Sequence, residues 1–190
     1  DAGLVVEARV LARCCLENAF WVAGIAKDGD KFIRRMLHED MRGRQTLGEL
    51  ALSKKPTLLE GVEDRLKELL RAIKKRQPYA QGLNPKGVAN DGPLADLYML
   101  YSQLSADAAH PTITSLNRFV GKGEANEKVI DVVPPIKECE VVMTLDWACN
   151  AVLGVCVGVN QLLGGTPAGR HLEAFGDRYY TYKLDEWPYS

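Results

Sequence analysis

The longest apolar run of the chain, residues 148–163, limits its fold more than any other feature. It is about 16 residues long and contains Asn150, Asn160 and Gln161. A transmembrane helix needs about 20 predominantly apolar residues. We therefore interpret this run as part of a core helix over residues 138–163, which ends at Gly164 and Gly165, and we expect no contact with a membrane.

Three segments in the first half of the chain show the helical spacing of apolar residues: 4–26, 31–52 and 58–76. The sequence Asp28-Gly29-Asp30 separates the first two, and Asp30 is expected to cap the second. Thr57 and Glu60 have the spacing of a capping box for the third.

The second half of the chain contains shorter elements. Residues 77–92 are rich in Gly, Pro, Asn and Asp and lack periodicity, so they are expected to form a long loop. A fourth helix is predicted from Pro93 to His110, where Pro111 disfavours its continuation. One or two helical turns over 112–119, a β-hairpin near 120–135 and a last helix over 166–182 follow.

These elements predict a mainly α protein, an antiparallel bundle of five or six helices with a short β-hairpin near 120–135. We expect residues 1–190 to form a single helical domain.

The composition limits the classes of partner. Positive and negative side chains nearly cancel, with 24 Lys plus Arg against 25 Asp plus Glu, so no overall charge attracts nucleic acid or an acidic membrane. The five cysteines form no CxxC pair, and the three histidines follow no HExxH pattern. We therefore expect a cytoplasmic protein with no disulfide framework, no metal and no cofactor.

A candidate site lies at the end of the predicted fourth helix. Tyr101 and Ser105 are four residues apart and share a helix face, and His110 follows at the helix end. A histidine there can titrate or can cap unpaired backbone carbonyls. A Ser–His nucleophile also needs a third group to orient the ring. Asp107 is too close in sequence to be a persuasive candidate, and no GxSxG motif surrounds Ser105.

The first predicted helix carries charges within its apolar stripe. Arg9, Arg13 and Glu17 follow one another at intervals of four residues. If they are buried, they must be paired, because isolated buried charges are costly. Asp146 and Asn150, also four residues apart, are candidates for a further polar group inside the bundle.

Two segments together resemble a known family. The sequence LARCCLENAFWV, which carries Arg13 and Glu17, precedes LYSQLSADAAHPT by about ninety residues. This combination resembles the bacterial domain-of-unknown-function family 5677, whose members carry an arginine and a glutamate on an early helix and a Y-x3-S-x4-H type motif on a later one. The resemblance implies a helical fold and supplies no mechanism.

The chain also resembles, more weakly, the nucleotide-binding and ribonuclease-like helical bundles of higher eukaryotes and prokaryotes, which often act in toxin–antitoxin and phage-defence systems. Active members of that group have an arginine four to six residues before a histidine. Here Ser105 stands five residues before His110, and no arginine lies between Leu97 and His110. This departure removes the cation that would stabilise charge on a cleaved phosphate, unless Arg13 supplies it.

Three hypotheses of function follow from the sequence. The first is a binding or interaction module, as a dimer in a bacterial stress or phage-defence setting. Its polar centre would form a buried hinge or a small-ligand pocket from Arg13, Glu17, Tyr101, Ser105 and His110, with Arg9 as a further binding residue. The second is a metal-independent ribonuclease or nucleotide-handling enzyme with His110 as general acid/base and Arg13 as its electrostatic partner. RNA or a nucleotide would then be its partner. The third is a structural subunit whose polar centre only fixes helix register.

Overall fold

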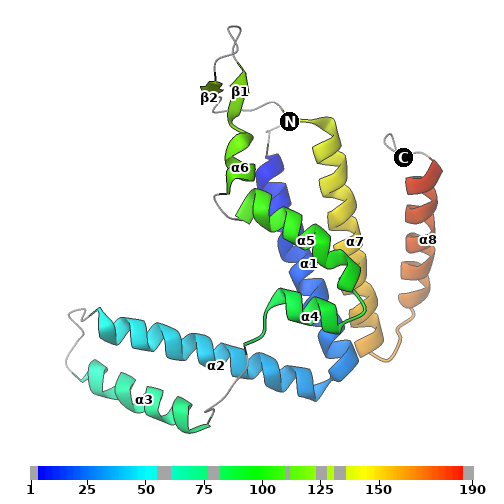
Figure 1. The fold of residues 1–190 in the computed structure, drawn as a ribbon. Coiled ribbons are helices and arrows are strands. Elements are labelled where there is room, and N and C mark those ends of the chain that lie inside the picture. The colour runs from blue at the N-terminus through cyan, green and yellow to red at the C-terminus, as the bar shows by residue number, and fades with distance from the viewer. Residues whose placement is uncertain are drawn as a thin grey trace. The chain divides into compact units, whose positions relative to one another are not determined.

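The structure is a computed structural model that describes residues 4–54, 61–76, 82–109, 112–122, 128–130 and 136–185. It is mainly α, as the sequence predicts (Figure 1). The described residues form eight α-helices: α1 Val5–Asp28, α2 Asp30–Ser53, α3 Val62–Arg76, α4 Pro85–Asp91, α5 Tyr98–Leu104, α6 Ile113–Asn117, α7 Glu138–Leu162 and α8 Gly169–Asp185. Five of them have 15 residues or more.

Three short elements complete the fold. A 3₁₀ turn, η1 Ala95–Leu97, precedes α5, and a π-helical turn, η2 Ser105–Ala109, follows it. Two strands, β1 Val120–Lys122 and β2 Lys128–Ile130, pair antiparallel with Val120 opposite Ile130. This strand pair confirms the β element predicted near residues 120–135.

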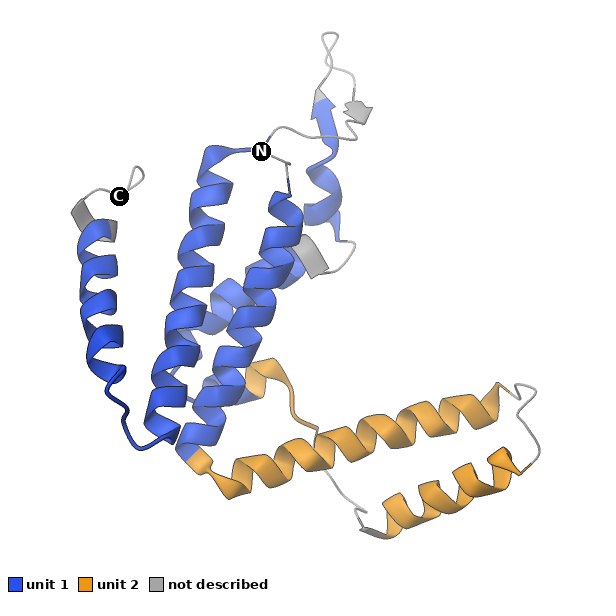
Figure 2. Cartoon of the chain, turned by 180° about the vertical axis from the view of Figure 1, so that it is seen from behind, with its two compact units in different colours: residues 1–27, 88–190 blue, residues 28–87 orange. Residues whose placement is uncertain are grey.

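The chain divides into two compact units, coloured separately in Figure 2. Unit 1 contains residues 1–27 and 88–190, and unit 2 contains residues 28–87. The expectation of a single domain stays a prediction, and each unit is described by itself.

The core of unit 1 forms around one face of α1. Leu16, Ala19 and Phe20 lie at helical spacing on that face and are almost fully buried. Leu104 of α5 and Trp147 of α7 are also buried in this unit. Helix α7 approaches α1 closely at Gly158, since a Cβ there would lie 2.5 Å from Val22 Cγ1 of α1.

Unit 2 is built mainly from α2 and α3, which contact one another. Gly48 of α2 is buried, and a Cβ at this position would lie within 3.4 Å of the side chains of Leu66 and Leu70 of α3. Lys74 of α3 also pairs with Glu49 of α2 at 3.0 Å. A glycine in α2 therefore allows the two helices to approach closely.

The predicted loop over residues 77–92 is wrong at its carboxyl end, where α4 forms. Asn84 accepts a hydrogen bond from the backbone N–H of Gly87 at 2.8 Å, and Pro85 takes the first helical position. Val88 and Ala89 are buried. Capping and burial thus overcome the low helix propensity of this segment.

Two predicted helix starts also differ. Gly29, with φ 52°, is the residue that caps α2, and no side-chain cap forms there. Pro93 lies in a turn, so the helix that carries Tyr101 begins with η1 and not at the proline. Two sets of predictions concern residues outside the described ranges. They are the capping box of Thr57 and Glu60, and the roles of His110 as a helix end and as an acid/base.

Helix α7 is long and apolar enough to cross a membrane when judged by length and hydropathy alone. It is the single helix of this kind among the residues that the structure describes. One such helix is weak support for a membrane span, because core helices of soluble proteins meet the same criterion.

Candidate functional site

Arg13 of α1 is the centre of a hydrogen-bonded cluster that joins α1 to α5 and η2. Its Nη2 donates to the hydroxyl of Tyr101 at 2.7 Å, and its Nε donates to the hydroxyl of Ser105 at 2.9 Å. Its Nη1 lies 3.5 Å from Glu17 Oε2, and the Tyr101 hydroxyl donates to the same oxygen at 3.3 Å. The structure therefore brings together Arg13, Glu17, Tyr101 and Ser105.

Helix geometry positions both halves of this cluster. Arg13 and Glu17 are one turn apart on α1, and Tyr101 and Ser105 are one turn apart across the end of α5. The Arg13 guanidinium also lies over the Tyr101 ring, 4.8 Å from its centroid. Burial, with the nearby Glu17 carboxylate, raises the pKa of Tyr101, so its hydroxyl stays protonated and can donate.

Arg9, one turn before Arg13, belongs to a second and more deeply buried cluster. Its guanidinium pairs with Asp107 of η2 and donates to the hydroxyl of Thr144 at 3.3 Å. Arg118 pairs with the same Asp107 oxygen at 2.8 Å and with Glu140 of α7 at 3.0 Å. The side chains of Arg9, Asp107 and Arg118 are only 8–11% exposed.

The π-helical turn explains why both clusters form. A π-helix has a wider turn than an α-helix and often occurs at functional positions. Here Ser105 reaches Arg13 and Asp107 reaches Arg9, so two residues of η2 bind two successive turns of α1. Sequence spacing could not indicate this, because it treats residues 93–110 as one regular helix.

Sequence reasoning missed four members of the second cluster: Asp107, Thr144, Arg118 and Glu140. Asp107 was considered only as an orienter of His110, and its position two residues from Ser105 argued against that role. The sequence offers one signal: a buried Arg9 needs an acidic partner. The sequence contains 25 acidic residues and does not indicate which one folds against α1.

The charges of the two clusters balance. Three arginines are matched by Glu17, Asp107 and Glu140. Burial by itself lowers the pKa of Arg118, but hydrogen bonds and charge from Asp107 and Glu140 raise it overall, so this guanidinium stays charged. The Nε–H group of Arg118 is buried and makes no hydrogen bond within the described part of the chain, and the Nε of Arg9 lies 2.5 Å from Asp107 Oδ2, at ion-pair distance but without hydrogen-bond geometry. Attraction between opposite charges is therefore a main part of what holds this cluster.

A third polar group lies between α7 and α8. Asn150 donates to the carboxylate of Asp146 at 2.9 Å, as their spacing on one helix face suggested. The hydroxyl of Tyr179 donates to the same carboxylate, and the hydroxyl of Tyr180 donates to Asn150 at 3.2 Å. Burial and the contact with Asp146 raise the pKa of Tyr179.

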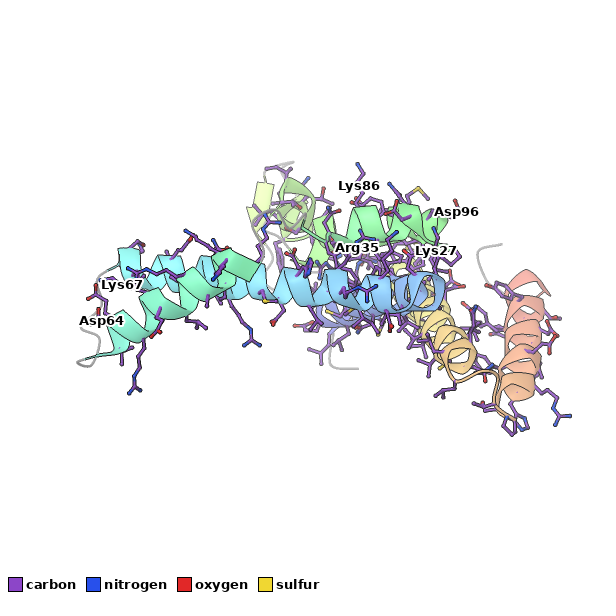
Figure 3. The ribbon with its side chains drawn as sticks, turned by 90° about the horizontal axis from the view of Figure 1, so that it is seen from below. Lys27, Arg35, Asp64, Lys67, Lys86 and Asp96 are labelled. Carbon is purple, nitrogen blue, oxygen red and sulfur yellow. The ribbon has the colours of Figure 1, made fainter. Side chains whose placement is uncertain are left out.

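Unit 1 also contains a cavity of about 900 Å³. Its walls come from the end of α1, the segment between α4 and α5, the second half of α7 and Tyr180 of α8. Lys27 and Asp96, labelled in Figure 3, are exposed and border it. Neither polar cluster on α1 lines this cavity, so the clusters and the cavity are separate features.

The other histidines of the chain do not extend the site. His38 and His171 are exposed on α2 and α8. No group of three or more His, Cys, Asp or Glu side chains suited to a metal ion occurs in the part of the chain that the structure describes. The role predicted for His110 as an acid/base stays a prediction, since that residue lies outside the described ranges.

Comparison with known proteins supports the resemblance found in the sequence. No curated protein and no solved structure matches the chain. The sequence model of a family described as a family of unknown function (DUF5677) matches residues 1–128. The match includes Arg9, Arg13, Tyr101 and Asp107, whereas α7 and α8 lie beyond it. It covers more than half of the 190 residues, and the chain belongs to this family of unknown function.

Proposed function

We propose that this protein is a binding module without catalytic activity, which holds a small, largely apolar molecule in the cavity of unit 1. Its polar clusters act as a clamp between α1 and the α5–η2 segment. The observation that carries the proposal is that the Arg13 guanidinium is already bonded to Glu17, Tyr101 and Ser105.

The arginines of the clamp are paired with acids of the same chain, which argues for a structural role of the clamp. Catalysis on a phosphate or an acyl group needs a cation or donor that is aimed at the developing charge. Arg9 and Arg118 share Asp107, and Arg13 is held by three partners, so each has its charge neutralised within the protein. A substrate would have to displace these bonds.

The position of the clamp supports its role in shaping the cavity. Ala23, Ala26 and Lys27, which line the cavity, follow Glu17 along α1. Leu94 and Leu97, which also line the cavity, come just before Tyr101 in sequence. Bonds between Arg13 and Tyr101 thus join two chain segments that both continue into the lining of the cavity.

The wider setting belongs to the same proposal: a cytoplasmic protein that forms homodimers in a bacterial stress or defence response. The sequence resemblances support the setting. The five cysteines are free, which fits a reducing compartment.

The two alternative functions require different features of the protein. A ribonuclease or nucleotide-handling enzyme would need His110 beside Arg13, and no observation in the described ranges favours it. A purely structural subunit would need the clamp but no ligand in the cavity, so binding at the cavity separates it from the proposal.

Filling the cavity tests the proposal. Ala26→Trp places a large side chain on its wall, whereas Leu11→Trp changes an exposed position of the same helix that does not line it. In a titration of the full chain with the fluorescent apolar probe anilinonaphthalene sulfonate, we expect Ala26→Trp to weaken binding at least tenfold and Leu11→Trp to leave it unchanged. Circular dichroism would show that both variants keep their helices.

Absence of probe binding to the unmodified protein, or equal binding by both variants, contradicts the proposal. RNA that copurifies with the protein and is lost in His110→Ala would instead support the nuclease alternative.

A further inference from the structure

Helix α7 carries a second apolar stripe besides the one that faces α1. Thr144, Trp147 and Ala151 are buried in unit 1. The other stripe repeats with the alternating three- and four-residue spacing of a coiled-coil seam: Leu145, Ala148, Val152, Val155, Val159 and Leu162. We call these six residues the α7 seam.

The seam is left largely uncovered by its own chain. Leu145 is 57% exposed, Val152 is 50% exposed and Leu162 is 44% exposed. Leu145, Ala148 and Val152 of the seam line an apolar groove of about 240 Å³ together with Leu172 and Phe175 of α8. The groove lies between α7 and α8, which are side by side in Figure 1. An exposed apolar surface of this kind favours a docking surface.

The sequence of the seam favours a second copy of α7, in antiparallel orientation. That orientation pairs Leu145 with Leu162 of the second copy, Ala148 with Val159 and Val152 with Val155, so every seam residue meets another seam residue. The flanking positions Cys149 and Cys156 of this stretch are uncharged and cannot repel their equivalents.

The charges at the two ends of α7 are complementary in the same orientation. Glu138, at the start of α7, is exposed. Arg170 is exposed at the start of α8, where Gly169 lies close to Asn160 of α7. Neither charge has an ion-pair partner within the described ranges. Antiparallel docking brings Glu138 of each copy to the end of the helix pair that carries Arg170 of the other, whereas parallel docking brings the two Glu138 side chains to the same end.

We propose that the α7 seam and the groove beside α8 form the homodimer interface of this protein, with α7 of the second copy docked antiparallel to α7 of the first. This inference rests on the dimeric state included in the proposed function and does not depend on a ligand in the cavity. It explains why an apolar stripe remains exposed on α7 although the neighbouring face of the helix is already packed.

A charge placed in the seam tests the interface. Val152→Glu introduces a carboxylate at the centre of the seam, and Met143→Glu introduces it on the same helix at a position that is 43% exposed and lies outside the seam. A symmetric dimer would bury two unpaired carboxylates in the first variant. We expect sedimentation equilibrium of the full chain to show a dimer whose association constant falls at least about 100-fold in Val152→Glu and stays unchanged in Met143→Glu.

Cysteine cross-linking tests the orientation. Cys149 and Cys156 lie on the same side of the seam, seven residues apart. With Cys14, Cys15 and Cys139 replaced by Ser, a short bismaleimide linker should join Cys149 of one copy to Cys156 of the other, identified by mass spectrometry of the linked peptides. Links of Cys149 to Cys149 would indicate the parallel arrangement and overturn the proposed one.

The failure modes are distinguishable. A dimer that Val152→Glu leaves intact would retain the dimeric state and overturn this interface. A monomer at every concentration would overturn both the interface and the dimeric part of the proposed function. Binding of the unmodified protein to vesicles of neutral phospholipid, lost in Val152→Glu, would assign the seam to a lipid surface and overturn the dimer interface.

Discussion

Arg13 of α1 donates a hydrogen bond of 2.7 Å to the hydroxyl of Tyr101 in α5 and lies 4.8 Å from the centroid of the same ring. One guanidinium thus makes a polar and an aromatic contact with a residue 88 positions away in sequence. The two contacts fix the distance and the rotation of α5 relative to α1. Substitutions at Arg13 or Tyr101 therefore test how α5 is held against α1.

Tyr101→Phe separates the hydroxyl from the ring. The variant keeps the ring contacts with Arg13 and Phe20 but leaves one N–H of Arg13 without its acceptor. We expect the free energy of unfolding to fall by about 1–3 kcal/mol, measured by urea denaturation. Tyr98→Phe is the matched control, because Tyr98 stacks on Tyr101 and no hydrogen bond of its hydroxyl is found in the described ranges. Equal losses in both variants would contradict the role assigned to the Tyr101 hydroxyl.

Asp107→Asn removes the acid that two buried arginines share. Arg9 would lose its only ion-pair partner in the described part of the chain, and Arg118 would keep only Glu140. We expect a loss of roughly 3–5 kcal/mol in the free energy of unfolding, because an uncompensated charge would stay buried. Asp40→Asn, which breaks an exposed pair with Arg44 on α2, should cause little change. A small effect of Asp107→Asn would show that the second cluster is not a clamp.

Gly158→Ala tests how closely α7 approaches α1. The new Cβ would lie 2.5 Å from Val22 Cγ1, so the Val22 side chain or one of the two helices must shift, and we expect a loss of about 1–3 kcal/mol in thermal or urea unfolding. Gly43→Ala in α2 is the control, because a Cβ there meets nothing within 4 Å. That variant should gain roughly 0.5–1 kcal/mol from helix propensity. A neutral Gly158→Ala would contradict the close approach.

Tyr179 should make stability depend on alkaline pH. Burial and the neighbouring Asp146 raise the pKa of Tyr179 above its ordinary value of 10 in the folded chain. The protonated form is therefore favoured by folding, so its contribution is fully present below pH 10 and is lost as pH rises above that value, where the unfolded chain releases the proton first.

The measurement is the urea midpoint between about pH 8 and pH 11. We expect the midpoint of the unmodified protein to fall above about pH 10 and that of Tyr179→Phe to fall less steeply. The raised pKa of Tyr101 acts in the same direction, so some slope should remain. Identical slopes in the two proteins would show that Tyr179 is not protected from ionisation.

The sequence by itself determined the long helices and the pairs of polar residues that share a helix face. The spacing of apolar residues predicted α1 and α7 nearly to their ends, because a helix that buries one face must repeat its apolar residues every three or four positions. The same local rule placed Arg13 with Glu17 and Tyr101 with Ser105, one turn apart on their helices. Resemblance to the family, rather than periodicity, suggested that the two pairs belong together.

Only the tertiary structure decided which acids neutralise Arg9 and where the hollow of unit 1 lies. Asp107, Arg118 and Glu140 come from η2, the end of α6 and α7, and no local pattern links segments that lie 11 to 33 residues apart along the chain. Likewise, α4 forms in a segment of low helix propensity because its Val88 and Ala89 become buried. Burial and charge pairing depend on which surfaces meet after the helices have formed, so they are properties of the packed chain and not of any window of its sequence.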